Sequence, residues 1–284
     1  MNKNFKYLMA VCAVTTFGAC PSQEKQRPLT LAESVVIGGV VGAAEVALPG
    51  QILSYGMNKS IKKESFVWRD SYKGFAANAF GQMPITAVQC AIKTKGTQYV
   101  EASQGSSLCD GQKVAISFTS GVGGALIDTP SNAVQLYLQD KSNAGKNTWQ
   151  ALKRLKRQCF RGFAPNAFIK EGPFAVGYQF LAPKGTQAVL QYVDNPLVAT
   201  AFGGAAAGVV TAVVTQPGVV LRNKMQNDIA GATYTATWQT IKKILKEEGF
   251  KGFYAGLKQR GTRVAIAVPL YVVYGAALEA QMRK

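Results

Sequence analysis

The chain has 284 residues, with 32 lysines and arginines against 15 acidic residues and no histidine, so its formal net charge is +17. The lack of histidine excludes histidine catalysis and histidine metal ligation. The five cysteines have no metal-type spacing and form no disulfide framework, so we expect free thiols, with Cys20 left open, and no bound metal. The sequence has no Walker-type loop, no Gly-x-Ser-x-Gly elbow and no cluster of carboxylates, so we expect no catalytic residues and no enzyme.

The first twenty residues have the layout of an export signal. Lys3 and Lys6 precede an apolar run over residues 7–19, and Cys20 is followed by a polar segment. This layout predicts a secretory or lipoprotein-like leader over residues 1–20. The alternative is an uncleaved hydrophobic extension, because the apolar run is too short to span a bilayer.

The rest of the chain contains one pattern three times. Each copy has a hydrophobic stretch with a proline near its end, a polar or basic segment, a Gly-Phe pair and a second hydrophobic stretch. The prolines recur at intervals of about 85 residues, and the copies are marked by Pro49, Pro130 and Pro217 and by Gly74, Gly162 and Gly252. The pattern predicts three two-helix repeats, over residues 30–100, 110–193 and 196–282.

Three stretches are rich in apolar and small residues, at 32–48, 114–127 and 196–220. Glycine and alanine let helices approach closely in a bilayer. The mean hydropathy is only +0.04, but six spans need only about 120 residues. We therefore predict an all-α membrane protein with six transmembrane helices, arranged as three pseudo-symmetric pairs with short surface helices. A soluble helical bundle is disfavoured because each interior glycine would cost up to about 1 kcal/mol in water.

The excess positive charge lies mainly in the polar segment of each repeat, over residues 59–73, 141–161 and 233–251. Basic segments between spans mark one side of a membrane and can contact anionic headgroups. A basic chain can also bind nucleic acid. The position of the clusters after the first helix of each repeat favours the membrane interpretation, and we expect no nucleic-acid partner.

The third repeat resembles the mitochondrial carrier family. It contains Gly-Gly-Ala-Ala-Ala-Gly at 203–208, Gln-Pro-Gly-Val-Val-Leu-Arg-Asn-Lys-Met-Gln at 216–226 and Glu-Gly-Phe-Lys-Gly-Phe-Tyr-Ala-Gly-Leu at 248–257. The family signature is Pro-x-Asp/Glu-x-x-Lys/Arg-x-Lys/Arg-x-Gln, followed by a surface helix and a glycine element. The likeness extends over residues 30–282 through the repeat, and it is degenerate in the first two copies. It implies a monomeric six-helix carrier of the mitochondrial inner membrane, with one central substrate site that opens alternately to each side.

In that family, a proline kinks the first helix of each repeat, and charged residues beyond the prolines close the matrix-side gate through ion pairs. The resemblance places the kinks at Pro49, Pro130 and Pro217. It places the acidic gate positions at Gln51, Asn132 and Val219 and the basic ones at Ser54, Gln135 and Arg222. Amide and hydroxyl contacts are weaker than ion pairs, so we expect a gate that opens easily and uniport-like transport beside exchange. The alternatives are that other pairs replace the missing charges or that the repeats are misaligned.

The family's substrate contact points correspond to Gln89, Lys93, Lys170, Glu171 and Arg263. A charge inside a membrane is costly and suggests function. The alternative is that Lys93 reaches the interface and that Lys170 and Glu171 form a local pair. Lysine and arginine at this depth favour an anionic metabolite, held by charge-assisted hydrogen bonds.

Two patterns divide the choice of substrate. Residues 84–95 resemble the ADP/ATP carrier, and a leader attached to a carrier fold resembles the carrier-like effectors that intracellular bacteria send to host mitochondria. A nucleotide such as ATP or ADP is therefore our first expectation. Lys170-Glu171-Gly-Pro-Phe174 resembles amino-acid and S-adenosylmethionine carriers, which are the alternative. An alternative of another class is a membrane scaffold or lipoprotein that transports nothing.

Lipid contacts are the last expectation. The resemblance implies bound cardiolipin at the helix N-termini after Gly74, Gly162 and Gly252, where free N–H groups can hold phosphate. We expect no other cofactor.

Overall fold

A computed structural model describes residues 30–45, 50–143, 145–228 and 231–282, and its regular elements in these ranges are all helices. The predicted leader over 1–20 and the kink expected at Pro49 lie outside the described residues. Cys90, Cys109 and Cys159 are free thiols, as expected.

The three repeats each contain two long helical segments. In the first repeat, α2 (Leu31–Glu45) and α3 (Gln51–Lys62) are followed by α4 (Phe75–Gln104). In the third, α9 (Pro196–Asn227) is followed by α11 (Leu257–Met282). The second consists of α5 (Asp110–Gln139) and a rod composed of η6 (Pro165–Glu171), α7 (Gly172–Val176), η7 (Gly177–Leu181) and α8 (Ala182–Leu190).

The rod of the second repeat alternates between π-helix and α-helix. Its π segments η6 and η7 end two residues before Pro173 and Pro183, respectively. A proline removes a backbone N–H and clashes with the carbonyl four residues earlier, and a wider π turn relieves that clash. Pro130 and Pro217 lie inside α5 and α9, where the sequence places kinks.

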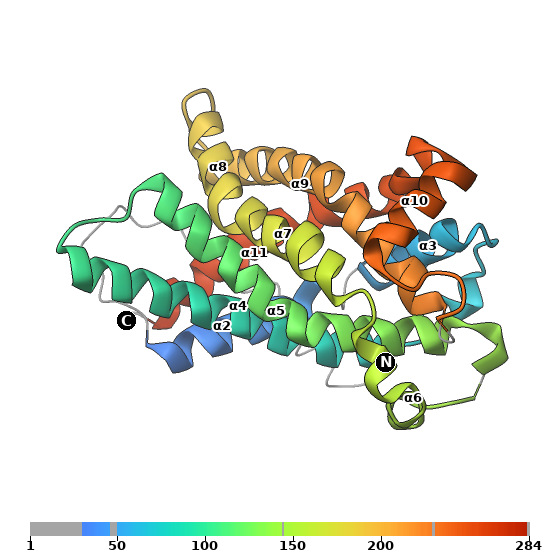
Figure 1. Cartoon of the computed structure of the whole chain (residues 1–284). Coiled ribbons are helices and arrows are strands. Elements are labelled where there is room, and N and C mark those ends of the chain that lie inside the picture. The colour runs from blue at the N-terminus through green and yellow to red at the C-terminus, as the bar shows by residue number, and fades with distance from the viewer. Residues whose placement is uncertain (1–29, 46–49, 144, 229–230, 283–284) are drawn as a thin grey trace, which may run out of the picture.

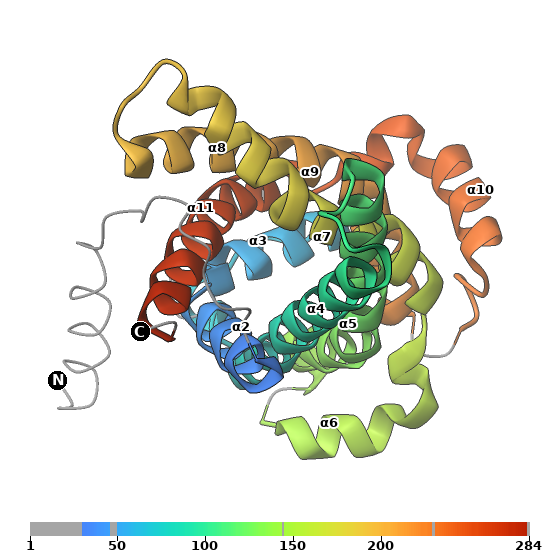
Figure 2. The ribbon, with the colours of Figure 1, turned by 90° about the vertical axis from the view of Figure 1, so that its left-hand side faces the viewer.

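The long helices form a closed ring in chain order, and the ring surrounds a central axis (Figures 1 and 2). α2 packs on α4, α4 on α5, α5 on the η6–α7 segment, α8 on α9, and α9 on α11. α11 then returns to α2 and α3 and closes the ring. Each repeat therefore supplies one third of the wall, and side chains from all three can meet at the centre.

Surface helices are present in two repeats. α6 (Thr148–Leu155) and α10 (Thr237–Glu248) both begin with Thr-Trp-Gln and lie outside the ring (Figure 2). Each packs one face inward, through residues that include Leu155 and Ile244. The first repeat has only the three-residue 3-10 turn η3 (Trp68–Asp70). The predicted short surface helices are thus present in the second and third repeats, whereas the described link over residues 63–74 contains only this turn.

Glycines let the helices cross closely, as the sequence predicts. A Cβ atom at Gly121 of α5 would lie 2.1 Å from the carbonyl oxygen of Glu171. A Cβ at Gly203 of α9 would lie 2.4 Å from backbone atoms of Gly185 and Thr186. Only glycine fits such contacts, so Gly121 brings the two long segments of the second repeat together and Gly203 brings the third repeat against the second.

One helix in the described part of the chain, α9, is long and apolar enough to cross a membrane by its length and composition alone. The finding bears on that helix only, and the prediction of six spans rests on the repeat.

Candidate substrate site and gate

A cavity at the centre of the ring contains about 790 Å³ of empty space, including the part open to solvent. Helices of all three repeats line it. Four cations and two carboxylates are among the lining residues, which leaves a surplus of two positive charges. They are Asp128, Lys170, Glu171, Arg222, Arg260 and Arg263.

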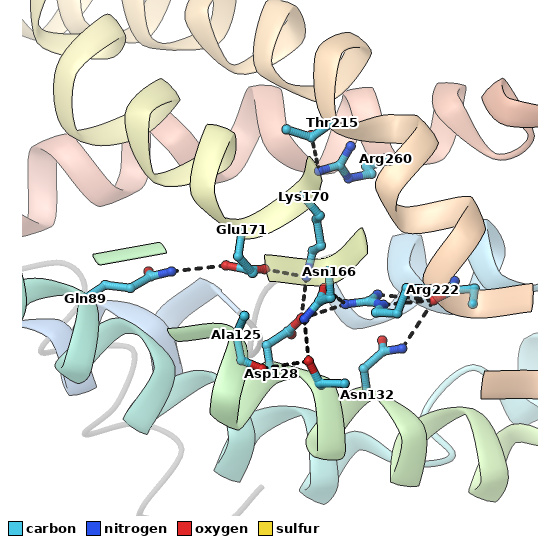
Figure 3. A network of polar contacts seen from close by, with 12 residues as sticks. Gln89, Ala125, Asp128, Asn132, Asn166, Lys170, Glu171, Thr215, Arg222 and Arg260 are labelled. Carbon is cyan, nitrogen blue, oxygen red and sulfur yellow. Dashed lines mark hydrogen bonds and ion pairs between the residues drawn. The ribbon is translucent and has the colours of Figure 1, made fainter. Parts of the chain in front are cut away.

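One carboxylate oxygen joins two of these cations (Figure 3). Asp128 Oδ2 lies 2.6 Å from Lys170 Nζ and 2.6 Å from Arg222 Nη1. The same Arg222 nitrogen donates a 2.9 Å hydrogen bond to Asn166 Oδ1. Arg222 is only 2% exposed and Asp128 8%. Buried charges of this kind persist only when they are paired and hydrogen-bonded, and here three helical segments from two repeats supply the partners.

A second carboxylate connects the first repeat to the second. Lys170 Nζ lies 2.5 Å from Glu171 Oε1, and Gln89 Nε2 of α4 donates a 3.0 Å hydrogen bond to Glu171 Oε2. The Tyr178 hydroxyl donates in turn to Gln89 Oε1 at 2.9 Å. Lys170 and Glu171 are thus a local pair that is also part of a network across the cavity wall.

Arg260 is a buried cation that the sequence analysis missed. Its guanidinium, on α11, donates to Thr215 Oγ1 at 2.6 Å, to Ala212 O at 2.9 Å and to Gln216 Oε1 at 3.3 Å. All three acceptors are neutral and lie on α9 just before Pro217, which interrupts the helical hydrogen bonds. Arg260 therefore attaches α11 to this interruption and adds positive charge to the cavity.

A sequence signal for Arg260 exists in the repeat. One position recurs four residues after a left-handed glycine, at the start of the second long helical segment of each repeat. It is occupied by Asn78, Asn166 and Arg260. Asn78 Nδ2 donates to Gln51 Oε1 at 2.8 Å, and Asn166 Nδ2 donates to Thr129 Oγ1 at 2.8 Å. In all three repeats the side chain at this position hydrogen-bonds to the first long helical segment of the repeat, close to the proline of that segment.

Four of the five predicted substrate contacts line the cavity, namely Gln89, Lys170, Glu171 and Arg263. Lys93 does not. It lies one turn beyond Gln89 on α4, its side chain is exposed, and it is not among the cavity-lining residues. Its position away from the cavity fits the alternative interpretation, because a long charged side chain gains hydration by extending away from an apolar helix surface. A substrate contact of Lys93 stays a prediction.

The predicted gate positions form amide contacts. Gln135 Nε2 lies 3.4 Å from Gln51 Oε1, which joins the first and second repeats through a weak hydrogen bond. Asn132 Nδ2 donates to Gln226 Oε1 at 2.7 Å and to Asn223 Oδ1 at 3.2 Å, which joins the second and third. These bonds connect neutral groups, and each contributes about 1 kcal/mol.

The remaining gate positions do not pair with each other. Val219 belongs to a buried apolar cluster with Met57 and Ile61. Ser54 is buried and lines the cavity. Arg222, the one charged gate residue, binds Asp128 instead of position 132. The carboxylate that engages it thus comes from a position outside the family signature.

The glycine expected at the start of the last helix is displaced by four residues. Gly74 and Gly162 have φ of +76° and +73° and lie just before the second long helical segment of their repeats, which begins with α4 and with the rod that contains η6. In the third repeat this place belongs to Gly256, with φ of +75°, next to the first residue of α11. Gly252 lies inside the short helix η8 (Phe250–Tyr254). Gly256, and not Gly252, is therefore the structural equivalent of Gly74 and Gly162, because it occupies the left-handed turn before the helix. The lipid contact at these helix starts stays a prediction.

Comparison with known proteins agrees with this architecture. The family model described as mitochondrial carrier protein matches residues 193–282, which is the third repeat. The mitochondrial carnitine/acylcarnitine carrier protein of Rattus norvegicus is 23% identical over 272 residues, covering 82% of this chain and 88% of the relative. A probable mitochondrial 2-oxodicarboxylate carrier of Dictyostelium discoideum is 23% identical over 273 residues, covering 86% and 88%.

A third relative matches over a shorter stretch. The probable mitochondrial 2-oxoglutarate/malate carrier protein of Dictyostelium discoideum is 25% identical over 203 residues, covering 65% of this chain and 63% of the relative. The chain thus spans less than two thirds of that relative. The third repeat thus matches the mitochondrial carrier family, whose members are transporters and not enzymes, and most of the chain is similar to carriers of that family. These matches give no support to the bacterial-effector hypothesis.

Proposed function

We propose that the chain is a transporter that carries an anionic metabolite across the mitochondrial inner membrane by alternating access. The ring architecture supports this function, because its charged and amide side chains face a central cavity. The outer face of α9 is apolar, with Phe202, Val210 and Val214 exposed. Lipid would cover such a face, so we assign α9 a membrane crossing and extend the assignment to the other five long helical segments through the repeat.

The charge balance of the cavity carries the substrate assignment. Four cations and two carboxylates give the cavity lining a net charge of +2. A positive lining attracts anions, and a ligand with two negative charges would balance it. A small dicarboxylate meets this condition. Two relatives are carriers of dicarboxylates by name.

A nucleotide is the second candidate, supported by an apolar wall beside the cations. Ile85, Phe174, Val264 and Ala267 line the same cavity as Lys170 and Arg263. A base could pack on this wall while phosphates contact the cations. ATP carries more negative charge than the cavity's surplus, so the dicarboxylate ranks first. An amino acid or S-adenosylmethionine would have to separate Glu171 from Lys170 to use both.

The gate supports exchange with some uniport. A gate closed by amide contacts such as Gln51–Gln135 is easier to break than a ring of ion pairs. The empty carrier could then reopen without substrate to offset the broken contacts, so net transport would accompany exchange.

Transport by purified protein in liposomes tests this function. Vesicles would be offered 2-oxoglutarate, malate, ATP, ADP, S-adenosylmethionine and lysine, with empty liposomes as control. We expect saturable uptake of the dicarboxylates, faster when the vesicles contain the same anion. Saturable uptake of ADP and ATP alone would make the nucleotide the substrate. Correctly inserted protein without flux of any of them would instead favour a scaffold.

A further inference from the structure

Asp128 breaks the three-fold pattern of the repeat. It stands two residues before Pro130, and the corresponding residue before Pro217 is Thr215. Thr215 accepts a hydrogen bond from Arg260 and remains neutral. Asp128 instead introduces a carboxylate among the cavity-lining cations. Neither the repeat nor the transport function requires a negative charge at this place.

The geometry gives this carboxylate two cations of unequal accessibility. The side chain of Arg222 is 2% exposed, whereas that of Lys170 is 14% exposed. Arg222 is also fixed by Asn166 and Asn223, through hydrogen bonds of 2.9 Å and 3.2 Å. Of the two partners of Asp128, Lys170 is therefore the one that a ligand in the cavity can take.

We propose that Asp128 is a built-in counter-ion of the substrate site. In the empty carrier it pairs with both Lys170 and Arg222, while Glu171 supplies the second negative charge on Lys170, and a carboxylate or phosphate of the substrate replaces Asp128 on Lys170. Asp128 then remains on Arg222 alone. This inference rests on the proposed function only in taking the ligand to be an anion.

Displacement has a consequence for selectivity. A substrate group that replaces Asp128 on Lys170 exchanges one charge-assisted contact for another, and the net gain is small. A second negative group that reaches Arg263, which lines the same cavity, adds a contact without displacing this carboxylate. The counter-ion thus favours ligands with two anionic groups over ligands with one.

Asp128 also links the substrate site to the gate. Lys170 belongs to the substrate contacts and Arg222 to the predicted gate, and both meet at Asp128 Oδ2. When a substrate anion pairs with Lys170, Asp128 pairs with Arg222 alone, and its attraction to Arg222 becomes stronger. Substrate binding is thereby sensed at the gate through a single carboxylate.

Asp128→Asn tests the counter-ion with little change of shape. Removal of a negative charge this close to the site should lower the apparent KM for 2-oxoglutarate on the order of tenfold. The preference for 2-oxoglutarate over the monoanion 2-oxobutyrate should shrink. Asp140→Asn is the matched control at the C-cap of the same helix, since Asp140 pairs with Lys62 at 3.4 Å outside the cavity, and it should leave KM unchanged.

Two further measurements keep the test decisive. Asp128→Thr copies the third repeat and should lower KM like Asp128→Asn if the asparagine variant folds poorly. Thermal stabilisation of the detergent-solubilised protein by malonate measures anion binding without transport. A half-saturating malonate concentration that falls in both variants supports the counter-ion even if wild type moves none of the offered metabolites. An unchanged or higher KM and half-saturating concentration in folded variants would overturn it.

Discussion

Gly121 of α5 lies directly against Glu171, so that a Cβ atom at the glycine would come within 2.1 Å of the Glu171 carbonyl oxygen. This contact sets the distance between α5, which presents Asp128, and η6, which presents Lys170. Gly121→Ala should therefore destabilise the protein by about 1–3 kcal/mol through overpacking and weaken substrate binding. Gly111→Ala is the control on the same helix, because a Cβ there meets only Cys109 Sγ at 4.0 Å. Thermal unfolding in detergent measures both, and equal stability of the two variants would contradict the tight crossing.

Arg263 should hold an anionic group of the substrate. Arg263→Ala removes charge-assisted hydrogen bonds of about 1.5–3 kcal/mol, so we expect the apparent KM for 2-oxoglutarate to rise by about ten- to a hundredfold. Arg263→Lys keeps the charge but loses the two-pronged geometry, and its KM should lie between those of wild type and Arg263→Ala. Lys93→Ala, which removes an exposed cation outside the cavity, should match wild type. Wild-type KM in correctly inserted Arg263→Ala protein would refute the assignment.

Glu171 distinguishes an anionic from a zwitterionic substrate. Glu171→Gln keeps a hydrogen-bond acceptor for Gln89 Nε2 and removes one negative charge from the cavity. Uptake of 2-oxoglutarate or ADP should hold or rise, because repulsion falls. Uptake of lysine or S-adenosylmethionine should fall, because the partner of a substrate ammonium is lost. Competition uptake into the same liposome preparation measures both. A loss of the same size for every compound would indicate a purely structural glutamate.

Position 132 can test the gate. Asn132→Asp restores the acidic residue of the family signature beside Asn223, whose side-chain oxygen already accepts from Arg222. The attraction of the new carboxylate to Arg222 is at most a few kcal/mol, since desolvation offsets part of it. Because an ionised carboxylate only accepts hydrogen bonds, the amides of Asn223 and Gln226 must turn their N–H groups toward it. We expect slower unidirectional efflux from preloaded vesicles while exchange changes less. A proportional fall in both rates would show that the gate does not control the balance between them.

Acid should weaken one contact between the first and third repeats. Burial tends to raise the pKa of Glu248, but hydrogen bonds from Lys224 and Lys63, at 2.7 and 3.2 Å, lower it below its usual 4.5. The folded state therefore binds this proton more weakly than the unfolded chain. The resulting stability is complete above pH 4.5 and disappears as the pH falls through the lowered pKa.

Glu248→Gln measures this contribution. The variant should be less stable than wild type by about 1 kcal/mol at pH 7, and the difference should be smaller at pH 3, because the pKa of Glu248 lies below its usual value. Glu247→Gln is the control, because the side chain of Glu247 is 52% exposed and lies 3.7 Å from Lys243. Unfolding temperatures at the two pH values check the prediction. A gap of the same size at both would show that the ionised carboxylate of Glu248 contributes nothing.

Much of the architecture could be predicted from the sequence because it is written in local patterns. The spacing of Pro130 and Pro217 and the apolar stretches before them indicate the helix pairs, since helix formation and burial depend on neighbouring residues. Glycines such as Gly121 and Gly203 indicated close crossings for the same reason. Gln89, Lys170, Glu171 and Arg263 were found because a charge or amide in an apolar helix is itself a signal.

The tertiary structure alone decided which of these charges meet. Asp128, Lys170 and Arg222 are far apart in the chain, and their shared oxygen depends on how three helical segments cross. Lys93 and Gln89 share a helix face, yet only Gln89 lines the cavity. The exchange of Gly252 for Gly256 reflects backbone conformation, which the Gly-Phe pattern does not encode. Sequence by itself determined the helices and the kind of groups they carry. Packing determined their partners, because electrostatic contacts depend on distances in space.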